Sequence, residues 1–155
     1  MIPPAELYDA LYYIKSCTDL HTPSLTQLVA AEFLNRGLLD GQIEKVIAMY
    51  KDRWEKMERA MREYFPSELK WVDTKGGMFT WLSLPIPSKD CDSIKMLGDC
   101  LDSCGVAYMP TASFYINPED GNNTIRLNFT SAPYERIEEG IEKLGGFLKN
   151  EIAKH

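Results

Sequence analysis

The fold is decided first by residues 40–65, DGQIEKVIAMYKDRWEKMERAMREYF. Asp40 is suited to cap a helix N-terminus, and Pro66 follows directly after the segment. A helix of about 25 residues is roughly 38 Å long, longer than a small domain needs, so we expect it to connect two domains. Its apolar side chains recur at alternating steps of four and three residues, forming one continuous face: Ile43, Ile47, Tyr50, Trp54, Met57, Met61 and Tyr64.

The opposite face of this expected helix carries acidic and basic residues four positions apart. Pairs at this spacing stabilise an exposed helix by about 0.2–0.5 kcal/mol each. The sequence predicts three of them: Asp52 with Lys56, Glu55 with Arg59, and Glu58 with Arg62.

After residue 65 the hydrophobic period changes to that of strands. We expect strands over residues 70–72, 78–84, 106–109 and 124–129, the first two joined by a glycine turn. The sequence therefore predicts an α+β domain over residues 66–155. Its small, mostly antiparallel sheet should be covered by helices on one face.

Two helices are expected among these strands. Asp92 can cap the first and Gly105 can close it. The second follows Pro133 and contains Gly145-Gly146, where each glycine costs about 1 kcal/mol relative to alanine. Close packing on a neighbouring element would offset that cost.

Residues 1–39 form a separate N-terminal part with two expected helices. Pro3 and Pro4 fit the start of one. Thr22 followed by Pro23 predicts an N-cap with proline at the first helical position, and Gly37 should end that second helix. The interruption between the two helices spans residues 18–24.

Composition excludes several classes of function. The formal net charge is −6 and no basic run is present, so nucleic acid and anionic membrane surfaces are poor partners. No apolar stretch reaches the roughly 20 residues of a membrane span. The four cysteines are not spaced as a zinc site, and we expect reduced thiols in a cytoplasmic protein.

One residue is a candidate for binding chemistry on pattern alone. Alternation along the strand expected at 124–129 puts Arg126 and Asn128 on the same face. An arginine there could lie on an edge strand and face water. Alternatively, its guanidinium could grip a carboxylate through two parallel hydrogen bonds. Neither a phosphate-binding loop nor a catalytic triad accompanies it, so the sequence by itself carries no catalytic apparatus.

Four motifs, in order along the chain, resemble class I pyridoxal-phosphate-dependent aminotransferases. The stretch from Thr18 to Ser24, with the following Gly37-Leu38-Leu39 and the long helix, is similar to the branch that handles aminoadipate, aromatic and branched-chain amino acids. The motifs are Thr18-Asp19-Leu20-His21-Thr22-Pro23-Ser24, Gly76-Gly77-Met78-Phe79, Gly105-Val106 to Pro110 with Ser113-Phe114, and Asn123-Thr124-Ile125-Arg126-Leu127-Asn128-Phe129. Thr111 departs from the family, which commonly has glycine after the proline.

The resemblance implies roles for particular residues. Arg126 matches the family's arginine that binds the α-carboxylate of the substrate. Asn128, on the same face of the strand, would also contact the substrate. Leu20, His21 and Thr22 match a loop that reaches the neighbouring subunit's active site in the family's homodimer. No arginine is present in that loop, so a dedicated aspartate specificity is disfavoured.

The same resemblance implies pyridoxal 5′-phosphate as cofactor of the intact enzyme. The family's Schiff-base lysine, its cofactor-phosphate arginine and the aspartate that faces the pyridine nitrogen all lie upstream of the matched region. We therefore expect the 155-residue chain to be inactive by itself and to form no covalent adduct with the cofactor.

The function implied is transfer of an amino group between an amino acid and a 2-oxo acid. The alternative is a non-catalytic ligand sensor, like the aminotransferase-like halves of certain bacterial transcription regulators. In either case the N-terminal helices and part of the long helix would normally pack on another domain. We therefore expect apolar residues such as Leu25, Leu28 and Trp54 to be exposed.

Overall fold

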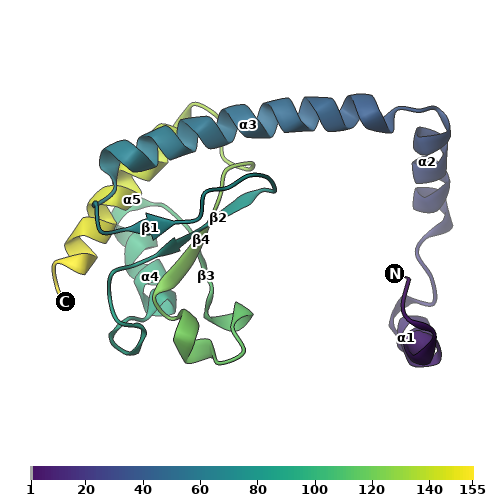
Figure 1. Ribbon diagram of the computed structural model, residues 1–155, viewed down its shortest axis with the longest axis horizontal. Coiled ribbons are helices and arrows are strands. Elements are labelled where there is room, and N and C mark those ends of the chain that lie inside the picture. Colours follow the sequence, from purple (N-terminus) through teal and green to yellow (C-terminus); the bar gives the residue numbers. More distant parts are fainter. Residues whose placement is uncertain (1) are drawn as a thin grey trace. The chain divides into compact units, whose positions relative to one another are not determined.

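The computed structural model describes residues 2–155. The chain divides between residues 46 and 47 into two compact units. Helices α1 (Ala5–Asp19) and α2 (Ser24–Asn35) lie in the first unit (Figure 1). Helix α3 (Leu39–Tyr64) begins in the first unit and ends in the second. Its bounds agree closely with the helix predicted over residues 40–65.

The first unit has no core of its own. Within residues 2–46 no side chain is buried, and Leu25 and Leu28 are 73% and 67% exposed, as expected. Gly37 ends the second helix in a left-handed conformation, φ +67°, which a residue without Cβ adopts readily. Thr22, however, does not cap α2. The helix begins at Ser24, so Pro23 fills the capping position and no side chain caps the first turn.

The second unit is built around a four-stranded antiparallel sheet of order β1-β2-β4-β3 (Figure 1). Its strands are β1 (Lys70–Trp71), β2 (Phe79–Ser83), β3 (Met109–Pro110) and β4 (Thr124–Asn128). The remaining helices are α4 (Ser93–Cys104) and α5 (Arg136–Ile152), with short 3₁₀ turns η1 (Ser88–Asp90), η2 (Ala112–Phe114) and η3 (Pro118–Gly121). This confirms the predicted α+β class.

Strand β3 begins three residues later than predicted. The run before it packs on α4, where the buried Tyr108 hydroxyl donates to the Ser93 carbonyl at 2.9 Å. Pro110 is the last residue of the strand and lies opposite Ile125 of β4. The position is tolerated because β3 is at the edge of the sheet, where a missing N–H leaves no ladder partner unsatisfied.

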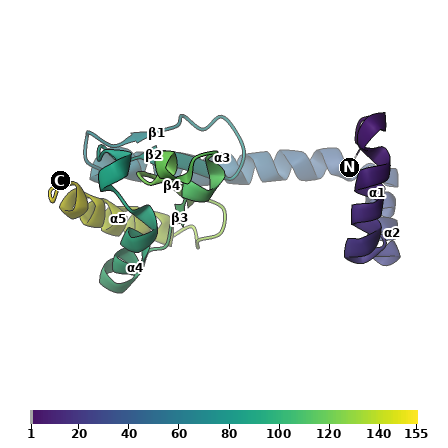
Figure 2. The same cartoon turned by 90° about the horizontal axis from the view of Figure 1, so that it is seen from below.

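The core lies between one face of the sheet and three helices. Leu82 of β2 and Ile125 and Leu127 of β4 point into it, and α3, α4 and α5 cover that face. Figure 2 shows α4 and α5 on the same side of the sheet. Trp54 was expected to be exposed, and that expectation was wrong. It is 9% exposed and its ring lies 5.5 Å from that of Phe129, because the C-terminal part of α3 packs in this unit's own core.

The two helix caps predicted around α4 are confirmed. The Asp92 carboxylate accepts hydrogen bonds from the amides of Ile94 and Lys95 at 3.1 and 3.0 Å. These bonds satisfy two of the four amides that a helix N-terminus leaves without intrahelical partners. Gly105 closes the helix with φ +69°.

Only one of the three predicted charge pairs forms on α3. Glu58 and Arg62 are 2.6 Å apart. Asp52 instead accepts a hydrogen bond from the Tyr134 hydroxyl at 3.3 Å, and the Lys56 ammonium lies 4.3 Å from the centroid of the same ring. Asp52 and Lys56 therefore interact with Tyr134, in the segment before α5, instead of with each other.

Candidate functional site

Arg126 lies on an interior strand. It is directly opposite Trp81 on β2 and Met109 on β3, because β4 pairs with a neighbour on each side. The edge-strand alternative is therefore wrong. Alternation places Arg126 and Asn128, both half-buried, on the face opposite the core. Phe79 and Trp81 share that face through the strand register.

Aromatic rings surround the Arg126 guanidinium. Its central carbon is 3.9 Å from the centroid of the Phe79 ring and 5.1 Å from that of Phe114. The Nε atom is buried without a hydrogen-bond partner in the part of the chain that the structure describes. Cation–π contacts of this kind stabilise a charge that has few polar neighbours. The guanidinium is thus held by apolar rings rather than by a carboxylate.

Phe114 is positioned by the compact turns that follow β3. The hydroxyls of Thr111 and Thr124 hydrogen-bond to each other, and the Thr111 amide donates to the Thr124 carbonyl at 3.3 Å. Trp81 meets the ring of Phe114 edge-on at 5.8 Å and that of Tyr115 at 6.2 Å. Thr111 is fully buried with φ −111°, so the position where the family commonly has glycine suits a threonine here.

Asn128 organises the turn that leaves β4. Its Oδ1 accepts hydrogen bonds from the amides of Thr130 and Ser131, at 2.6 and 3.1 Å, and from the hydroxyl of Thr130 at 2.9 Å. Arg53 of α3 fixes the same turn by donating from Nε to the Phe129 carbonyl at 2.7 Å. The side-chain oxygen Oδ1 of Asn128 therefore has a structural role, and only the side-chain nitrogen Nδ2 is left to donate to a ligand.

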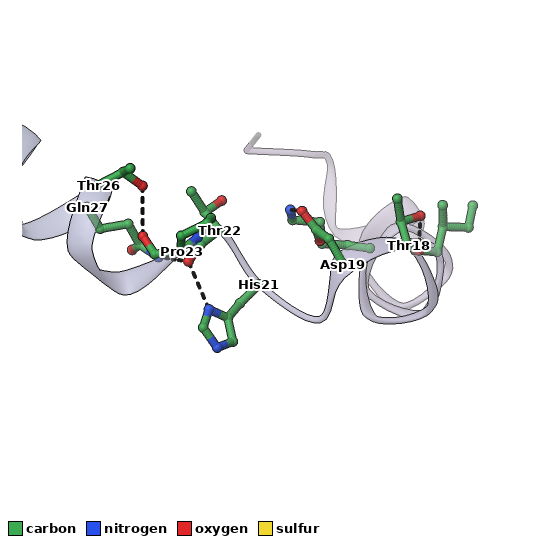
Figure 3. Close-up of polar contacts among 9 residues, drawn as sticks. Thr18, Asp19, His21, Thr22, Pro23, Thr26 and Gln27 are labelled. Carbon is green, nitrogen blue, oxygen red and sulfur yellow. Dashed lines mark hydrogen bonds and ion pairs between the residues drawn. The ribbon is translucent and has the colours of Figure 1, made fainter.

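The segment predicted to serve a neighbouring active site lies in the first unit (Figure 3). The Thr22 carbonyl accepts from Gln27 Nε2 at 2.6 Å, and His21 Nδ1 lies 2.8 Å from it. Leu20 is 77% exposed and has φ +60°, a left-handed conformation that is uncommon for a leucine. Leu20, His21 and Thr22 thus form an ordered turn whose apolar and imidazole side chains are exposed.

Neither a metal site nor an obvious cofactor pocket accompanies Arg126. Among residues 2–155, no three His, Cys, Asp or Glu side chains are arranged to hold a metal ion. No lysine of this described part is buried. The same residues include no helix long and apolar enough to cross a membrane. Two surface depressions, one between α4 and α5 and one beside the end of α3, are lined by other residues than Arg126.

All four cysteines are free thiols. Cys100 and Cys104 lie on one turn of α4 with their sulfurs 3.5 Å apart. Burial raises the pKa of Cys91 to about 11 and that of Cys100 to about 12. Buried neutral thiols are poor nucleophiles, so these two residues act as core side chains.

The small antiparallel sheet with helices over one face is the fold of the small domain of aspartate-aminotransferase-like proteins. No family model matches the sequence. The chain is 39% identical over 140 residues to aromatic-amino-acid aminotransferase 1 of Thermococcus litoralis, covering 90% of this chain and 32% of that protein. The crystal structure of a multiple substrate aminotransferase from Thermococcus profundus superposes with a TM-score of 0.84 at 34% identity, over 97% of this chain and 36% of that one.

Two further similarities concern the cofactor and the alternative function. The α-aminoadipate aminotransferase of Thermus thermophilus, whose crystal structure holds N-(5′-phosphopyridoxyl)-L-leucine, matches with a TM-score of 0.83 at 31% identity, over 99% of this chain and 38% of that one. An uncharacterised HTH-type transcriptional regulator of Bacillus subtilis is 32% identical over 149 residues, covering 96% of this chain and 30% of the regulator.

The resemblance stated from the sequence is confirmed. The chain's homologues and structural neighbours are pyridoxal-phosphate-dependent aminotransferases, and the chain corresponds to their small C-terminal part. It spans about a third of the length of these proteins.

Proposed function

We propose that this chain is the C-terminal part of an aminotransferase in which Arg126 binds the α-carboxylate of the amino-acid substrate. One observation carries the proposal: an arginine on an interior strand, flanked by two aromatic rings, forms no ion pair with a carboxylate among residues 2–155. A carboxylate bound through two parallel hydrogen bonds would supply the missing partner.

The cofactor of the proposed enzyme is pyridoxal 5′-phosphate, which supplies the electron sink for the chemistry at the substrate's α-carbon. This chain's contribution is to bind and orient. Arg126 fixes the carboxylate end of the substrate, and the amide of Asn128 lies on the same face of the sheet. None of the residues 1–155 matches the family's Schiff-base lysine.

The proposed substrates are amino acids that need no side-chain carboxylate to be recognised, together with their 2-oxo acids. Support comes from the turn at Leu20, His21 and Thr22, which offers an exposed leucine and a histidine but no arginine. In the proposed homodimer this turn contributes to the partner subunit's active site. The four free thiols support a reducing compartment such as the cytoplasm, and the net charge of −6 disfavours nucleic acid as a partner of this domain.

A second candidate function is ligand sensing within a transcription regulator. The Bacillus subtilis regulator supports it, because its similarity covers nearly the whole chain. Both candidates use Arg126 in the same way, since a sensor must also bind its amino acid. Sequencing the gene upstream of the codon for Met1 separates them. A helix–turn–helix segment would support the sensor, and a large domain with a Schiff-base lysine would support the enzyme.

The enzyme proposal is tested by a chimera in which this chain replaces the corresponding C-terminal part of the Thermococcus litoralis aminotransferase. We expect the chimera to bind the cofactor and to transfer amino groups from an aromatic amino acid to a 2-oxo acid. The 155-residue chain alone, treated with the cofactor and borohydride, should show only sparse labelling of several lysines. A folded chimera without turnover, or one dominant lysine adduct on the chain alone, would argue against the proposal.

A further inference from the structure

Two aromatic rings lie against the Arg126 guanidinium. Phe79 comes from β2, where it lies opposite Asn128 and diagonal to Arg126. Phe114 is the last residue of η2, the short turn that follows β3. Two separate elements therefore contribute one ring each, at 3.9 and 5.1 Å from the guanidinium carbon. Each distance lies within the range in which a ring face attracts a cation.

The environment of Arg126 Nε indicates how the two rings stabilise the guanidinium. This atom is buried and donates to no described residue. An unpaired buried donor is costly, because it has lost its water and gained no partner. The electron-rich ring faces offset part of that cost and confine the guanidinium. Its terminal nitrogens are then the donors through which it can bind a ligand.

The two rings also differ in how they are held. Phe79 is fixed by the backbone pairing of β2, and it is 37% exposed. Phe114 is 55% exposed, yet its ring meets Trp81 edge-on, and its backbone amide bonds to the Thr111 carbonyl at 2.9 Å. Both rings therefore stay partly exposed while they lie against the guanidinium.

We propose that Phe79 and Phe114 are positioning residues that orient the Arg126 guanidinium for a carboxylate ligand before the ligand arrives. The proposal rests on the proposed function of Arg126 and extends it to two residues that need not touch the carboxylate. Pre-orientation reduces the side-chain entropy that Arg126 would otherwise lose on binding.

The first test uses the 155-residue chain and does not depend on activity. The Nε–H resonance of Arg126, assigned by its loss in Arg126→Lys, should exchange slowly with solvent and be shifted by the neighbouring rings. In Phe79→Leu we expect its exchange to accelerate about tenfold or more, because the cover over Nε is lost. Phe79→Met, whose unbranched and flexible side chain also removes the ring, serves the same purpose should the leucine variant fail to fold. Unchanged exchange in a folded variant would overturn the proposal.

The second test uses the chimeric aminotransferase. Phe114→Leu should raise KM for the amino acid about 2- to 30-fold, the range that one cation–π contact implies, while kcat changes by less than about twofold. Phe114→Tyr keeps the ring and should restore KM. Ile116→Ala is the matched control, because Ile116 is fully exposed two residues away. A purely structural role would instead lower kcat through loss of folded enzyme and leave KM unchanged.

The outcomes separate this inference from the proposed function. If Arg126→Ala impairs the chimera but Phe114→Leu behaves like Ile116→Ala, the positioning role is wrong and the carboxylate site stands. If Arg126→Ala has no effect on turnover, the proposed function itself fails, and with it the role of the rings in binding.

Discussion

Two adjacent glycines of α5 give a matched pair of stability measurements. A Cβ added at Gly145 would lie 2.5 Å from the Tyr64 carbonyl oxygen and 3.2 Å from the Phe65 ring. At Gly146 a Cβ would meet nothing within 4 Å. Both residues are inside the same helix, so alanine raises helix propensity by the same amount at each. The difference between the two variants therefore reports the close approach of α5 to the end of α3.

The magnitude follows from two opposing effects. Replacing a helical glycine by alanine gains about 1 kcal/mol, and Gly146→Ala should show nearly all of it. Inserting a methyl group into a packed contact costs about 1–3 kcal/mol, and at Gly145 the obstacle is a backbone carbonyl that cannot rotate away. We expect Gly145→Ala to be less stable than Gly146→Ala by about 1–3 kcal/mol.

Urea unfolding of the 155-residue chain, followed by tryptophan fluorescence, measures this difference. With a slope of about 2 kcal/mol per molar urea, the midpoints should differ by roughly 0.5–1.5 M. If Gly145→Ala equals or exceeds Gly146→Ala in stability, the contact between α5 and the end of α3 is not as close as described.

Three further outcomes are expected. Trp54→Ala should lower the free energy of unfolding by about 3–5 kcal/mol in the same assay, because Trp54 is buried against the core; a loss below 1 kcal/mol would contradict this placement. Burial raises the pKa of Cys91 from 9.0 to about 11, so the contribution of its neutral thiol to stability is fully present below pH 9. The free energy of unfolding should therefore fall between pH 9 and 11, and Cys91→Ala should lessen that fall. The 155-residue chain should self-associate in sedimentation experiments through exposed residues such as Leu25 and Leu28, and their replacement by lysine should reduce association; a strictly monomeric chain that binds no hydrophobic dye would count against it.

Local patterns in the sequence predicted the elements well. The four-and-three spacing located α3 to within a residue or two, and alternation at Ile125, Arg126 and Leu127 assigned the two faces of β4 correctly. Asp92 and Gly105 identified both ends of α4. These features depend on period and on backbone chemistry, and both are written in neighbouring residues.

What the sequence could not show depends on pairing between distant segments. The order of the strands decides that Arg126 is interior, and no local pattern contains that order. Similarly, Asp52 and Lys56 were expected to pair with each other, but Tyr134, far along the chain, competes for both. The aromatic rings around Arg126 also come from separate elements. Phe79 and Phe114 each lie within a motif of the family resemblance, yet neither motif predicts their contact with the guanidinium.

Arg126 is the residue on which the proposed function depends. Removing a guanidinium that holds a carboxylate through two hydrogen bonds costs about 2–5 kcal/mol of binding free energy when the carboxylate stays buried and unpaired. At 1.4 kcal/mol per tenfold, this corresponds to a fall in kcat/KM of roughly 30- to several-thousand-fold for Arg126→Ala. Arg126→Lys restores the charge without the planar fork and should recover only part of the loss.

The most direct measurement is therefore kcat/KM for amino-acid turnover by the chimeric aminotransferase carrying Arg126→Ala or Arg126→Lys, with cofactor absorbance recorded in parallel. We expect the alanine variant to lose at least about 30-fold, the lysine variant to lie between it and the unsubstituted chimera, and the cofactor absorbance to be unchanged in both. Turnover of Arg126→Ala at near the unsubstituted efficiency would show that Arg126 does not bind the substrate carboxylate.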